Sequence, residues 1–273
     1  MRVSMVVTDL DGTLLDGQRR LSAADRATLE DLGRRGITRV VATGRSLFSA
    51  RRVLGPDVPI DFLAHTSGAG IVSWPGQESL LARHMPGALS VLLAERLLAL
   101  ELDFMLHRAI PDNHHFFMHK SSRQNHDFDR RVELYAPYAA ELRLSLLGRE
   151  AMCQAVVIEP LTTLGRHAEL ALALPEFRLI RATSPLDHVS AWFEVFPEGV
   201  AKSSAAAWVR ERMGNVVGSC VAVGNDYNDV DLLDWADLPF VVANAPEELR
   251  VRYPNVPSNE ASGFSAAVRQ ALD

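Results

Sequence analysis

Cysteine is scarce in this sequence, and each cysteine stands alone. The 273 residues include two, Cys153 and Cys220, which lie far apart and inside apolar runs. A disulfide framework or a cysteine metal site would need more cysteines or a closer spacing. The pattern instead predicts two buried thiols in a reducing compartment.

Long apolar segments are also missing. The most apolar stretch, residues 88–102, is interrupted by Glu95, Arg96 and Glu101 and is too short to span a bilayer. At the N-terminus a short apolar run is followed by two aspartates, which does not fit a secretory signal peptide. We therefore expect a soluble, cytoplasmic protein without a membrane partner.

Charge of one sign is not concentrated anywhere along the chain. The net charge is −6 and no long basic stretch occurs, so we do not expect nucleic acid as the main partner. With 48% hydrophobic and 23% charged residues, the composition is that of a globular protein of one large domain or two modest ones. The sequence shows no internal repeat and gives no indication of the oligomeric state.

Strand and helix signals alternate at both ends of the chain. The first helix has a defined start and end, because Ser22 can cap it with Asp25 three residues on and Gly36 closes it. We expect strands at 3–8, 38–42, 62–65, 217–223 and 240–243, and helices at 22–36, 46–55, 203–214, from about 229, and 261–272. This alternation predicts an α/β fold with a Rossmann-like, doubly wound parallel sheet that helices cover on both faces.

The middle of the chain has a different character. It carries most of the histidines and aromatic residues, and its length of about a hundred residues suits a small domain of its own. We therefore expect a catalytic core of residues 1–80 and 188–273, with an inserted, smaller mixed α/β cap of residues 81–187 that sets substrate specificity. Proline and glycine at 74–76 and 197–199 predict hinges near both ends of this insertion.

Polar clusters fall where the predicted core strands end, which is where α/β sheets bind their ligands. The first is Asp9 and Asp11, followed by Gly12 and Thr13, which supply a turn. Two carboxylates in one cavity can act as a nucleophile and as a proton donor and acceptor, in either assignment. Their charges would repel each other unless a divalent cation joined them, and oxygen ligands suit Mg²⁺. A surface Asp-Gly turn is the simpler alternative.

The second and third clusters suit a phosphate group. Thr43-Gly44-Arg45 joins a strand to a helix, where a hydroxyl and backbone N–H groups can bind phosphate, although a plain helix cap would also fit. Lys202 stands at the start of another helix. Beside clustered carboxylates a lysine balances the charge on the nucleophile and the phosphoryl group, whereas alone it would be a surface residue.

The fourth cluster comprises the polar residues directly after another buried strand: Asn225, Asp226, Asn228 and Asp229. These side chains can complete a metal shell to which Asp9 and the backbone carbonyl of Asp11 contribute. The alternative is a helix cap with favourable acidic residues in the first turn.

In their order along the chain the clusters DLDGTLLD, ATGR, the lone Lys202 and GNDYND resemble the four motifs of the haloacid dehalogenase (HAD) superfamily of phosphatases. The position of the insertion, between the second and third motifs, resembles the Cof-type sugar-phosphatase subgroup. The tail NAPEELRVRYPNVPSNEASGFSAAV is similar to the closing pattern of that subgroup. The likeness covers both ends of the chain, and over the cap it rests on position and size alone.

This resemblance implies a Mg²⁺-dependent phosphomonoesterase that acts on small phosphorylated metabolites, foremost sugar phosphates. By the same resemblance Asp9 attacks phosphorus and forms a phosphoaspartate, while Asp11 protonates the leaving alcohol and then activates water. The residues expected around the phosphoryl group are Thr43, Gly44, Arg45, Asn228 and Lys202. The expected metal ligands are Asp9, Asp11, Asn225, Asp226 and Asp229.

One residue departs from the GDxxND pattern usual in the subgroup. When the motif is aligned on Asn228 and Asp229, the place of its first aspartate, a metal ligand, is taken by Asn225. An amide oxygen can bind Mg²⁺ but carries no charge, so either Asn225 binds as a neutral ligand or Asp226 turns in. We expect Asn225 together with Asp229, and weaker metal binding than three carboxylates would give.

The expected cap carries histidines near basic residues. Of these we expect His115 and Arg123 to contact the substrate when the cap closes, although an exposed, partly cationic edge is the simpler interpretation. Two rival functions remain. A phosphomutase resembling phosphomannomutase would share the four motifs and depend on a sugar bisphosphate. A phosphosugar-binding regulator with decayed catalysis is favoured by Asn225 alone.

Overall fold

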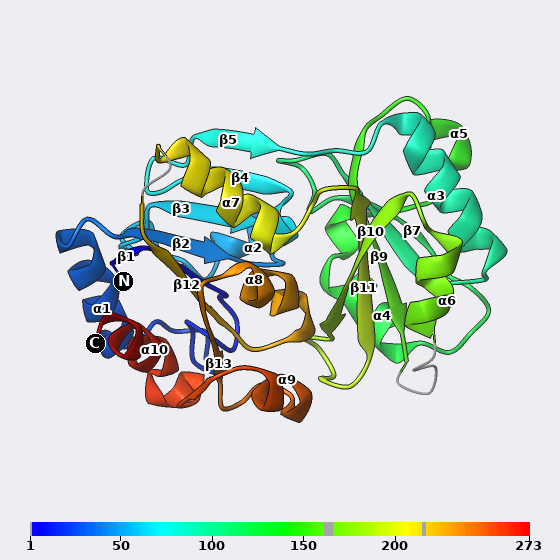
Figure 1. Ribbon diagram of the computed structural model, residues 1–273. Helices are drawn as coiled ribbons and strands as arrows, with labels where there is room; N and C mark the ends of the chain where they lie inside the picture. The colour runs from blue at the N-terminus through cyan, green and yellow to red at the C-terminus, as the bar shows by residue number, and fades with distance from the viewer. Residues whose placement is uncertain (1, 161–165, 215–216) are drawn as a thin grey trace. The chain divides into compact units, whose positions relative to one another are not determined.

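The chain folds into two compact units in the computed structural model, which describes residues 2–160, 166–214 and 217–273. Unit 1 comprises Met1–Ala82 and Ala201–Asp273, and unit 2 comprises Arg83–Val200 (Figure 1). Unit 2 is thus an insertion into unit 1. No helix in the described part of the chain combines the length and the hydrophobicity needed to cross a membrane.

Unit 1 is built on an eight-stranded sheet with the order β14-β13-β12-β1-β2-β3-β4-β5. Its strands are β1 (Val3–Thr8), β2 (Thr38–Ala42), β3 (Phe62–His65), β4 (Gly70–Ser73), β5 (Ser79–Ala82), β12 (Ser219–Gly224), β13 (Leu238–Val242) and β14 (Asn255–Val256). The strands from β14 to β3 are parallel, and β4 and β5 extend the sheet as antiparallel strands. The predicted doubly wound sheet is confirmed.

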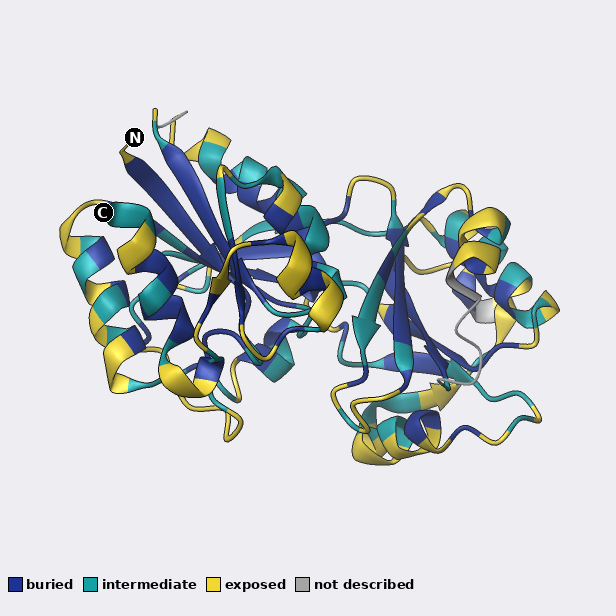
Figure 2. Cartoon of the chain, turned by 60° about the horizontal axis from the view of Figure 1, so that its bottom comes forward, coloured by how far each residue is buried: buried dark blue, intermediate teal, exposed yellow. Residues whose placement is uncertain are grey.

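Helices cover this sheet on both faces, and the alternation of side chains along β1 shows why. The helices are α1 (Ala23–Arg34), α2 (Leu47–Ala50), α7 (Lys202–Arg212), α8 (Val230–Trp235), α9 (Glu247–Arg252) and α10 (Gly263–Leu272). Val6 packs in a cluster with residues of α1, α2 and α10, whereas Met5 and Val7 pack in another with residues of α7, α8 and α9. Both faces of the strand are therefore buried, and Figure 2 shows buried strands at the centre of the sheet.

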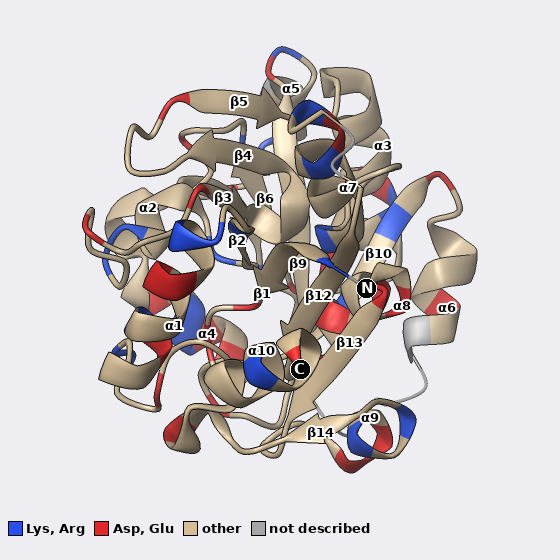
Figure 3. Cartoon of the chain, turned by 60° about the vertical axis from the view of Figure 1, so that its left-hand side comes forward, with Lys and Arg blue, Asp and Glu red and all other residues tan. Residues whose placement is uncertain are grey.

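Local signals set the ends of the helices. Ser22 caps α1, since its hydroxyl accepts a hydrogen bond from the backbone N–H of Asp25 at 3.0 Å, and Gly36 follows the helix with φ +69°. In α9 the acidic residues lie in the first turn and the basic residues in the last (Figure 3), the order that the helix dipole favours. The expected helix at 46–55 is shorter than predicted and ends at Ala50.

The expected hinge at residues 74–76 is a hairpin turn within unit 1. It joins β4 to β5, and the backbone N–H of Gln77 donates to the carbonyl of Ser73 at 2.8 Å. A proline and a glycine suit a tight turn as well as a hinge, so the sequence did not separate the two. The chain enters unit 2 after Ala82.

Unit 2 is built on a six-stranded sheet with the order β10-β11-β9-β6-β7-β8. Its strands are β6 (Phe104–Arg108), β7 (Phe116–His119), β8 (Ala139–Glu141), β9 (Met152–Glu159), β10 (Phe177–Thr183) and β11 (Ala191–Pro197). Its helices are α3 (Gly87–Ala99), α4 (His126–Leu134), α5 (Leu144–Leu147) and α6 (Arg166–Ala173). Unit 2 reaches Val200, further than the expected 187, because β11 pairs with β9 and β10.

Candidate active site

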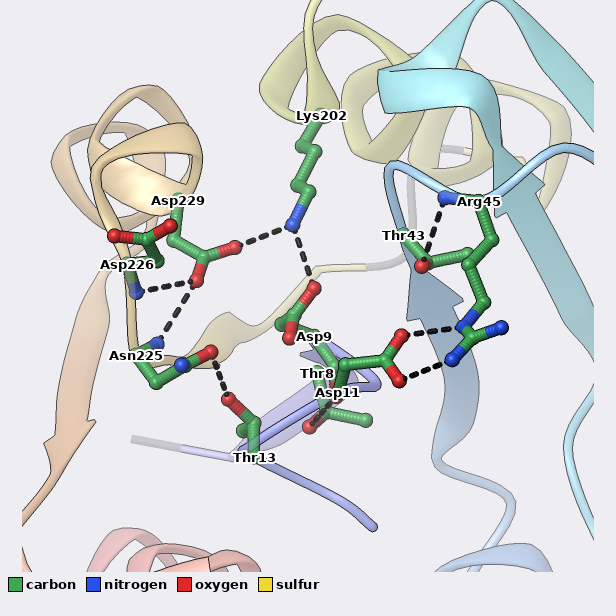
Figure 4. A network of polar contacts seen from close by, with 10 residues as sticks. All are labelled: Thr8, Asp9, Asp11, Thr13, Thr43, Arg45, Lys202, Asn225, Asp226 and Asp229. Atoms are coloured by element: carbon green, nitrogen blue, oxygen red, sulfur yellow. Dashed lines mark hydrogen bonds and ion pairs between the residues drawn. The ribbon is translucent and has the colours of Figure 1, made fainter. Parts of the chain in front are cut away.

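The site lies at the carboxyl end of the parallel strands in unit 1, where the strand order reverses. Asp9 follows β1, Thr43 follows β2 and Asn225 follows β12, and these three strands are neighbours in the sheet. From β1 the chain runs outward through β2 and β3 on one side and through β12 and β13 on the other. Ligands of open α/β sheets bind at such a point. Figure 4 shows the side chains that gather there.

Lys202 joins two of the predicted clusters through a pair of short ion pairs. Its Nζ lies 2.6 Å from Oδ1 of Asp9 and 2.6 Å from Oδ1 of Asp229 (Figure 4). All three side chains are buried. A buried lysine without a carboxylate partner would be costly, so the two aspartates and the lysine stabilise one another.

Burial shapes the protonation of this group. Burial raises the pKa of Asp9 to about 7, against the lowering effect of Lys202, and the neighbouring charge of Asp229 raises it further. Burial by itself would lower the pKa of Lys202, but the carboxylates of Asp229 and Asp9 outweigh it and raise that pKa. A carboxylate held in a dry site beside a fixed cation is a combination suited to covalent chemistry.

Asp229 also organises the loop after β12. Its Oδ2 accepts hydrogen bonds from the backbone N–H groups of Asn225 at 2.8 Å and Asp226 at 3.1 Å. The fit against the preceding strand is close, because a Cβ atom added to Gly224 would lie 2.6 Å from Cβ of Asp229. With Oδ1 bound to Lys202, both oxygens of Asp229 have protein partners.

Arg45 pairs with Asp11. Its Nε and Nη2 donate to Oδ2 and Oδ1 of Asp11, each at 2.6 Å, and its Nη1 donates to the hydroxyl of Ser49 at 2.8 Å. The hydroxyl of Thr43 accepts from the backbone N–H of Arg45 at 3.2 Å. The second motif is therefore tied to the first through an arginine that the sequence predicted as a phosphate ligand.

The remaining predicted residues of the fourth motif have separate surroundings. In Figure 4 the carboxylate of Asp226 points away from Asp9. Within the described part of the chain, the side chain of Asn228 makes no hydrogen bond to the other predicted residues. Asn225 points inward, and its side-chain amide contacts the hydroxyl of Thr13 at 2.9 Å.

The oxygen atoms around Asn225 could hold a metal ion with a single carboxylate among its protein ligands. The described residues include no group of three or more histidine, cysteine or acidic side chains that could hold a metal. The inward amide atom of Asn225 lies 3.2 Å from Oδ2 of Asp9 and 3.1 Å from the carbonyl oxygen of Asp11. One carboxylate, one carbonyl and one amide can thus meet at one point, a set of hard ligands that suits Mg²⁺.

A turn that the sequence interpretation missed packs against this site. It is the short 3₁₀ helix Thr66–Gly68 after β3, whose residues all have positive φ. Its backbone N–H groups donate to the second motif, from Thr66 to the carbonyl of Arg45 at 2.7 Å and from Ser67 to that of Thr43 at 2.9 Å. A Thr-Ser-Gly run directly after a predicted strand was the available signal.

Two asparagines from the C-terminal segment hold the loop that follows Asp9. The side-chain amide of Asn244 donates to the carbonyl of Gly12 at 2.8 Å, and that of Asn259 donates to the carbonyl of Leu15 at 2.9 Å. Nothing in their sequence spacing links these residues to the first motif, so only the fold reveals their position.

The two predicted substrate residues of the cap lie in unit 2. The ring of His115 packs at a tilt against that of His114, with 4.4 Å between the centroids, and edge to face against that of Tyr138 at 5.1 Å. Arg123 lies 3.8 Å from the carboxylate of Glu159. Both side chains are partly exposed on unit 2. Their contact with a substrate stays a prediction.

Known proteins with similar sequences include two phosphatases. An HMP-PP phosphatase of Cronobacter sakazakii is 25% identical over 266 residues, which cover 91% of this chain and 87% of that protein. An HMP-PP phosphatase of Shigella flexneri is 26% identical over 257 residues, covering 93% and 89%.

Solved structures share the fold at lower identity. A phosphatase of the HAD superfamily from Bacteroides thetaiotaomicron superposes with a TM-score of 0.79 at 19% identity, covering 98% of this chain and 95% of that one. A sugar phosphatase of HAD subclass IIB superposes with a TM-score of 0.78 at 15% identity, covering 98% and 99%. The family of haloacid dehalogenase-like hydrolases matches residues 6–267. The chain therefore belongs to the haloacid dehalogenase-like hydrolases, as its four motifs predicted.

Proposed function

We propose that this hydrolase is a metal-dependent phosphomonoesterase of small phosphorylated metabolites, foremost sugar phosphates, and that it works through a phosphoaspartate on Asp9. The observation that carries the proposal is the buried Lys202 between Asp9 and Asp229, with both contacts at 2.6 Å. The names of the relatives, an HMP-PP phosphatase and a sugar phosphatase, support the same class of reaction.

In the first step a carboxylate oxygen of Asp9 attacks phosphorus. A bond forms between this oxygen and phosphorus while the bond from phosphorus to the leaving oxygen breaks, and Asp11 gives its proton to the leaving oxygen. In the second step Asp11 takes a proton from a water molecule, whose oxygen attacks phosphorus and releases Asp9. Inorganic phosphate and the alcohol are the products, and both aspartates return to their starting states.

Lys202 and the second motif would hold the phosphoryl group. An ammonium group has three N–H donors, and Asp9 and Asp229 accept from it, so a further N–H can reach a phosphoryl oxygen. The hydroxyl of Thr43 and the backbone N–H of Gly44 would bind the other oxygens. The dipole of α2 adds little, because this helix has only four residues.

A divalent metal ion completes the proposed site, since phosphatases of this superfamily generally use one. We propose Mg²⁺, held by the carboxylate of Asp9, the backbone carbonyl of Asp11 and the side chain of Asn225. When bound, the ion would neutralise charge that develops on the phosphoryl group. Asp229 binds Lys202 and two backbone N–H groups, which favours a positioning role for it over ligation.

Unit 2 would choose the substrate, with His115 and Arg123 as proposed contacts. Substitution of either residue would change the ranking of substrates more than the turnover of p-nitrophenyl phosphate. The small leaving group of that substrate would depend little on contacts with unit 2. An equal loss on every substrate would argue against this role. The two buried free cysteines support action in a reducing compartment such as the cytoplasm.

The test is release of inorganic phosphate from sugar phosphates, HMP-PP and p-nitrophenyl phosphate, with Mg²⁺ or with EDTA. Wild type is expected to turn over with Mg²⁺ only, and Asp9→Asn is expected to abolish turnover while leaving the fold intact. Asp112→Asn is the matched control, because it makes the same change at an exposed residue of unit 2 that has no part in the proposed reaction. Turnover that survives Asp9→Asn would overturn the proposal. Turnover that requires a sugar bisphosphate would indicate a mutase, and binding without turnover a regulator.

A further inference from the structure

The side-chain amide of Asn225 stands among the oxygen atoms that the proposed metal ion would bind. One of its two terminal atoms lies 2.9 Å from Oγ1 of Thr13, 3.2 Å from Oδ2 of Asp9 and 3.1 Å from the carbonyl oxygen of Asp11. The ionised carboxylate of Asp9 and the backbone carbonyl of Asp11 can accept hydrogen bonds but cannot donate them. The identity of the inward atom of Asn225, nitrogen or oxygen, therefore decides what this point can bind.

With the nitrogen inward, the amide acts as a hydrogen-bond donor. Nδ2 then lies within hydrogen-bond distance of Asp9, Asp11 and Thr13, and its two N–H groups can serve two of these three acceptors without a metal. With the oxygen inward, as Figure 4 draws it, Oδ1 accepts from the hydroxyl of Thr13 at 2.9 Å. When Asp9 is ionised, the oxygen of Asn225 then faces those of Asp9 and Asp11 with no proton between them, an arrangement that a cation would stabilise.

The spacing suits that cation. Neighbouring ligands of an octahedral Mg²⁺ at about 2.1 Å are separated by about 3.0 Å. The distances of 3.2 Å and 3.1 Å from the inward atom of Asn225 to Asp9 and Asp11 are close to this value. An oxygen of Asn225 at that place could therefore bind Mg²⁺ beside Oδ2 of Asp9 and the carbonyl oxygen of Asp11. Only a small shift of these atoms would be needed to reach the spacing of Mg²⁺ ligands.

The surroundings permit the amide to turn while the backbone stays fixed. The backbone N–H of Asn225 is held by Asp229 at 2.8 Å. The hydroxyl of Thr13 can donate to Oδ1 or accept from Nδ2, so it serves both orientations. The outer atom of the amide faces Gly12, where an added Cβ would lie 2.8 Å away. Gly12 therefore leaves space for the amide of Asn225 to rotate, whereas a larger residue at position 12 would hinder that rotation.

We propose that Asn225 is a two-state group that replaces the metal ion with its own N–H in the metal-free protein and turns its oxygen inward when the ion binds. The inference rests on the proposed function for the location of the ion. Its consequence is that Mg²⁺ competes with internal hydrogen bonds for Asp9 and Asp11. A carboxylate at position 225 cannot donate those hydrogen bonds. Asn225→Asp should therefore destabilise the metal-free state and stabilise the metal-bound state.

The experiment compares wild type, Asn225→Asp and the control Asp112→Asn, at an exposed residue of unit 2, without substrate. In EDTA we expect Asn225→Asp to have a lower Tm than wild type, because a new carboxylate faces Asp9 and the carbonyl of Asp11 with only the hydroxyl of Thr13 to donate to it. With Mg²⁺ titrated alone, we expect its Kd to fall at least about tenfold by calorimetry, because a charged ligand replaces a neutral one. Asp112→Asn should match wild type in both measurements.

A direct readout is the side-chain amide of Asn225 in a ¹H–¹⁵N spectrum, assigned by its absence from Asn225→Asp. In EDTA its N–H signals should exchange slowly with solvent, and Mg²⁺ should shift them and speed their exchange. An Asn225→Asp protein that is as stable as wild type in EDTA, or that binds Mg²⁺ no more tightly, would overturn the inference. Since neither readout uses turnover, loss of activity in the phosphate assay with these results intact would overturn the proposed function alone.

Discussion

Arg45 holds both carboxylate oxygens of Asp11, with Nε 2.6 Å from Oδ2 and Nη2 2.6 Å from Oδ1. Such a two-point contact fixes the plane of the carboxylate as well as its position. Because Ser49 accepts from the third nitrogen at 2.8 Å, the guanidinium is itself held in place. We therefore interpret Arg45 as a positioning residue that holds Asp11 as a carboxylate, the form that the base of the second step needs. The acid of the first step needs a proton on one oxygen of Asp11, so at least one of these two contacts must open for that step.

Substitution of Arg45 distinguishes this role from phosphate binding. Arg45→Ala should slow the first step with a sugar phosphate by up to about 100-fold, because a misplaced acid cannot protonate the leaving oxygen. The first step with p-nitrophenyl phosphate, followed as the burst of p-nitrophenolate, should slow much less, because p-nitrophenolate leaves without a proton. The second step uses Asp11 as the base for either substrate, so the comparison is made on the first step alone. Ser49→Ala, which removes only the outer contact, should affect both substrates mildly. Equal losses in the rate of the first step with both substrates would instead indicate that Arg45 binds the phosphoryl group.

Removal of the Lys202 charge should destabilise unit 1. Lys202→Met keeps the apolar stem but leaves the buried carboxylates of Asp9 and Asp229 facing each other, which should reduce the free energy of unfolding by about 3–5 kcal/mol in EDTA. Urea unfolding at neutral pH measures the loss. The double variant Lys202→Met with Asp9→Asn should be more stable than the single variant, since one of the two charges is gone. If Lys202→Met is as stable as wild type, this ion-pair network does not contribute to the free energy of unfolding.

The strands and the strand-end motifs were predictable because their signals are local. Val3–Thr8 and Thr38–Ala42 are short runs rich in apolar and β-branched residues, and the structure places strands at these residues. Once parallel strands are assumed, their carboxyl ends must meet at one edge, which brings Asp9, Thr43 and Asn225 together.

The partners within the site were not predictable in the same way. Arg45 could reach a phosphate or a carboxylate, and only the path of the backbone decides that Asp11 accepts from it. Asn244 contacts Gly12 across 232 positions of the chain, and no spacing rule connects them. Contacts of this kind depend on side-chain placement after folding, whereas a strand depends on its own residues.

Gly68 fits under the start of α7 and should be intolerant of a side chain. A Cβ atom there would lie 2.2 Å from the carbonyl oxygen of Ala201, the residue before Lys202, and the φ of Gly68 is +94°. Gly68→Ala should therefore displace the backbone that carries Lys202 and lower both Tm and kcat. Gly36→Ala is the matched control, because φ there is also positive at +69° but no atom lies within 4 Å. If both variants lose stability equally and keep full turnover, the packing against Ala201 does not position Lys202.

His107 should make the stability of unit 2 depend on pH. Burial, together with the charge of Arg131, lowers its pKa to about 3, although Nδ1 lies 2.8 Å from the carbonyl of Asn113. In the unfolded chain histidine titrates near 6.5, so between these values the unfolded state binds more protons and stability falls as the pH falls. The expected slope from this residue is about 1.4 kcal/mol per pH unit.

The variant that tests this slope is His107→Gln, whose amide can still donate to the carbonyl of Asn113. Its unfolding free energy should decline less steeply than that of wild type from pH 6 to pH 4. Above pH 7.5 the histidine is neutral in both states, so the two curves should run parallel there, whatever offset the substitution causes. Denaturant unfolding followed through the tryptophan signal across this range measures both slopes. Curves that stay parallel down to pH 4 would show that His107 takes up its proton in the folded protein as readily as in the unfolded chain.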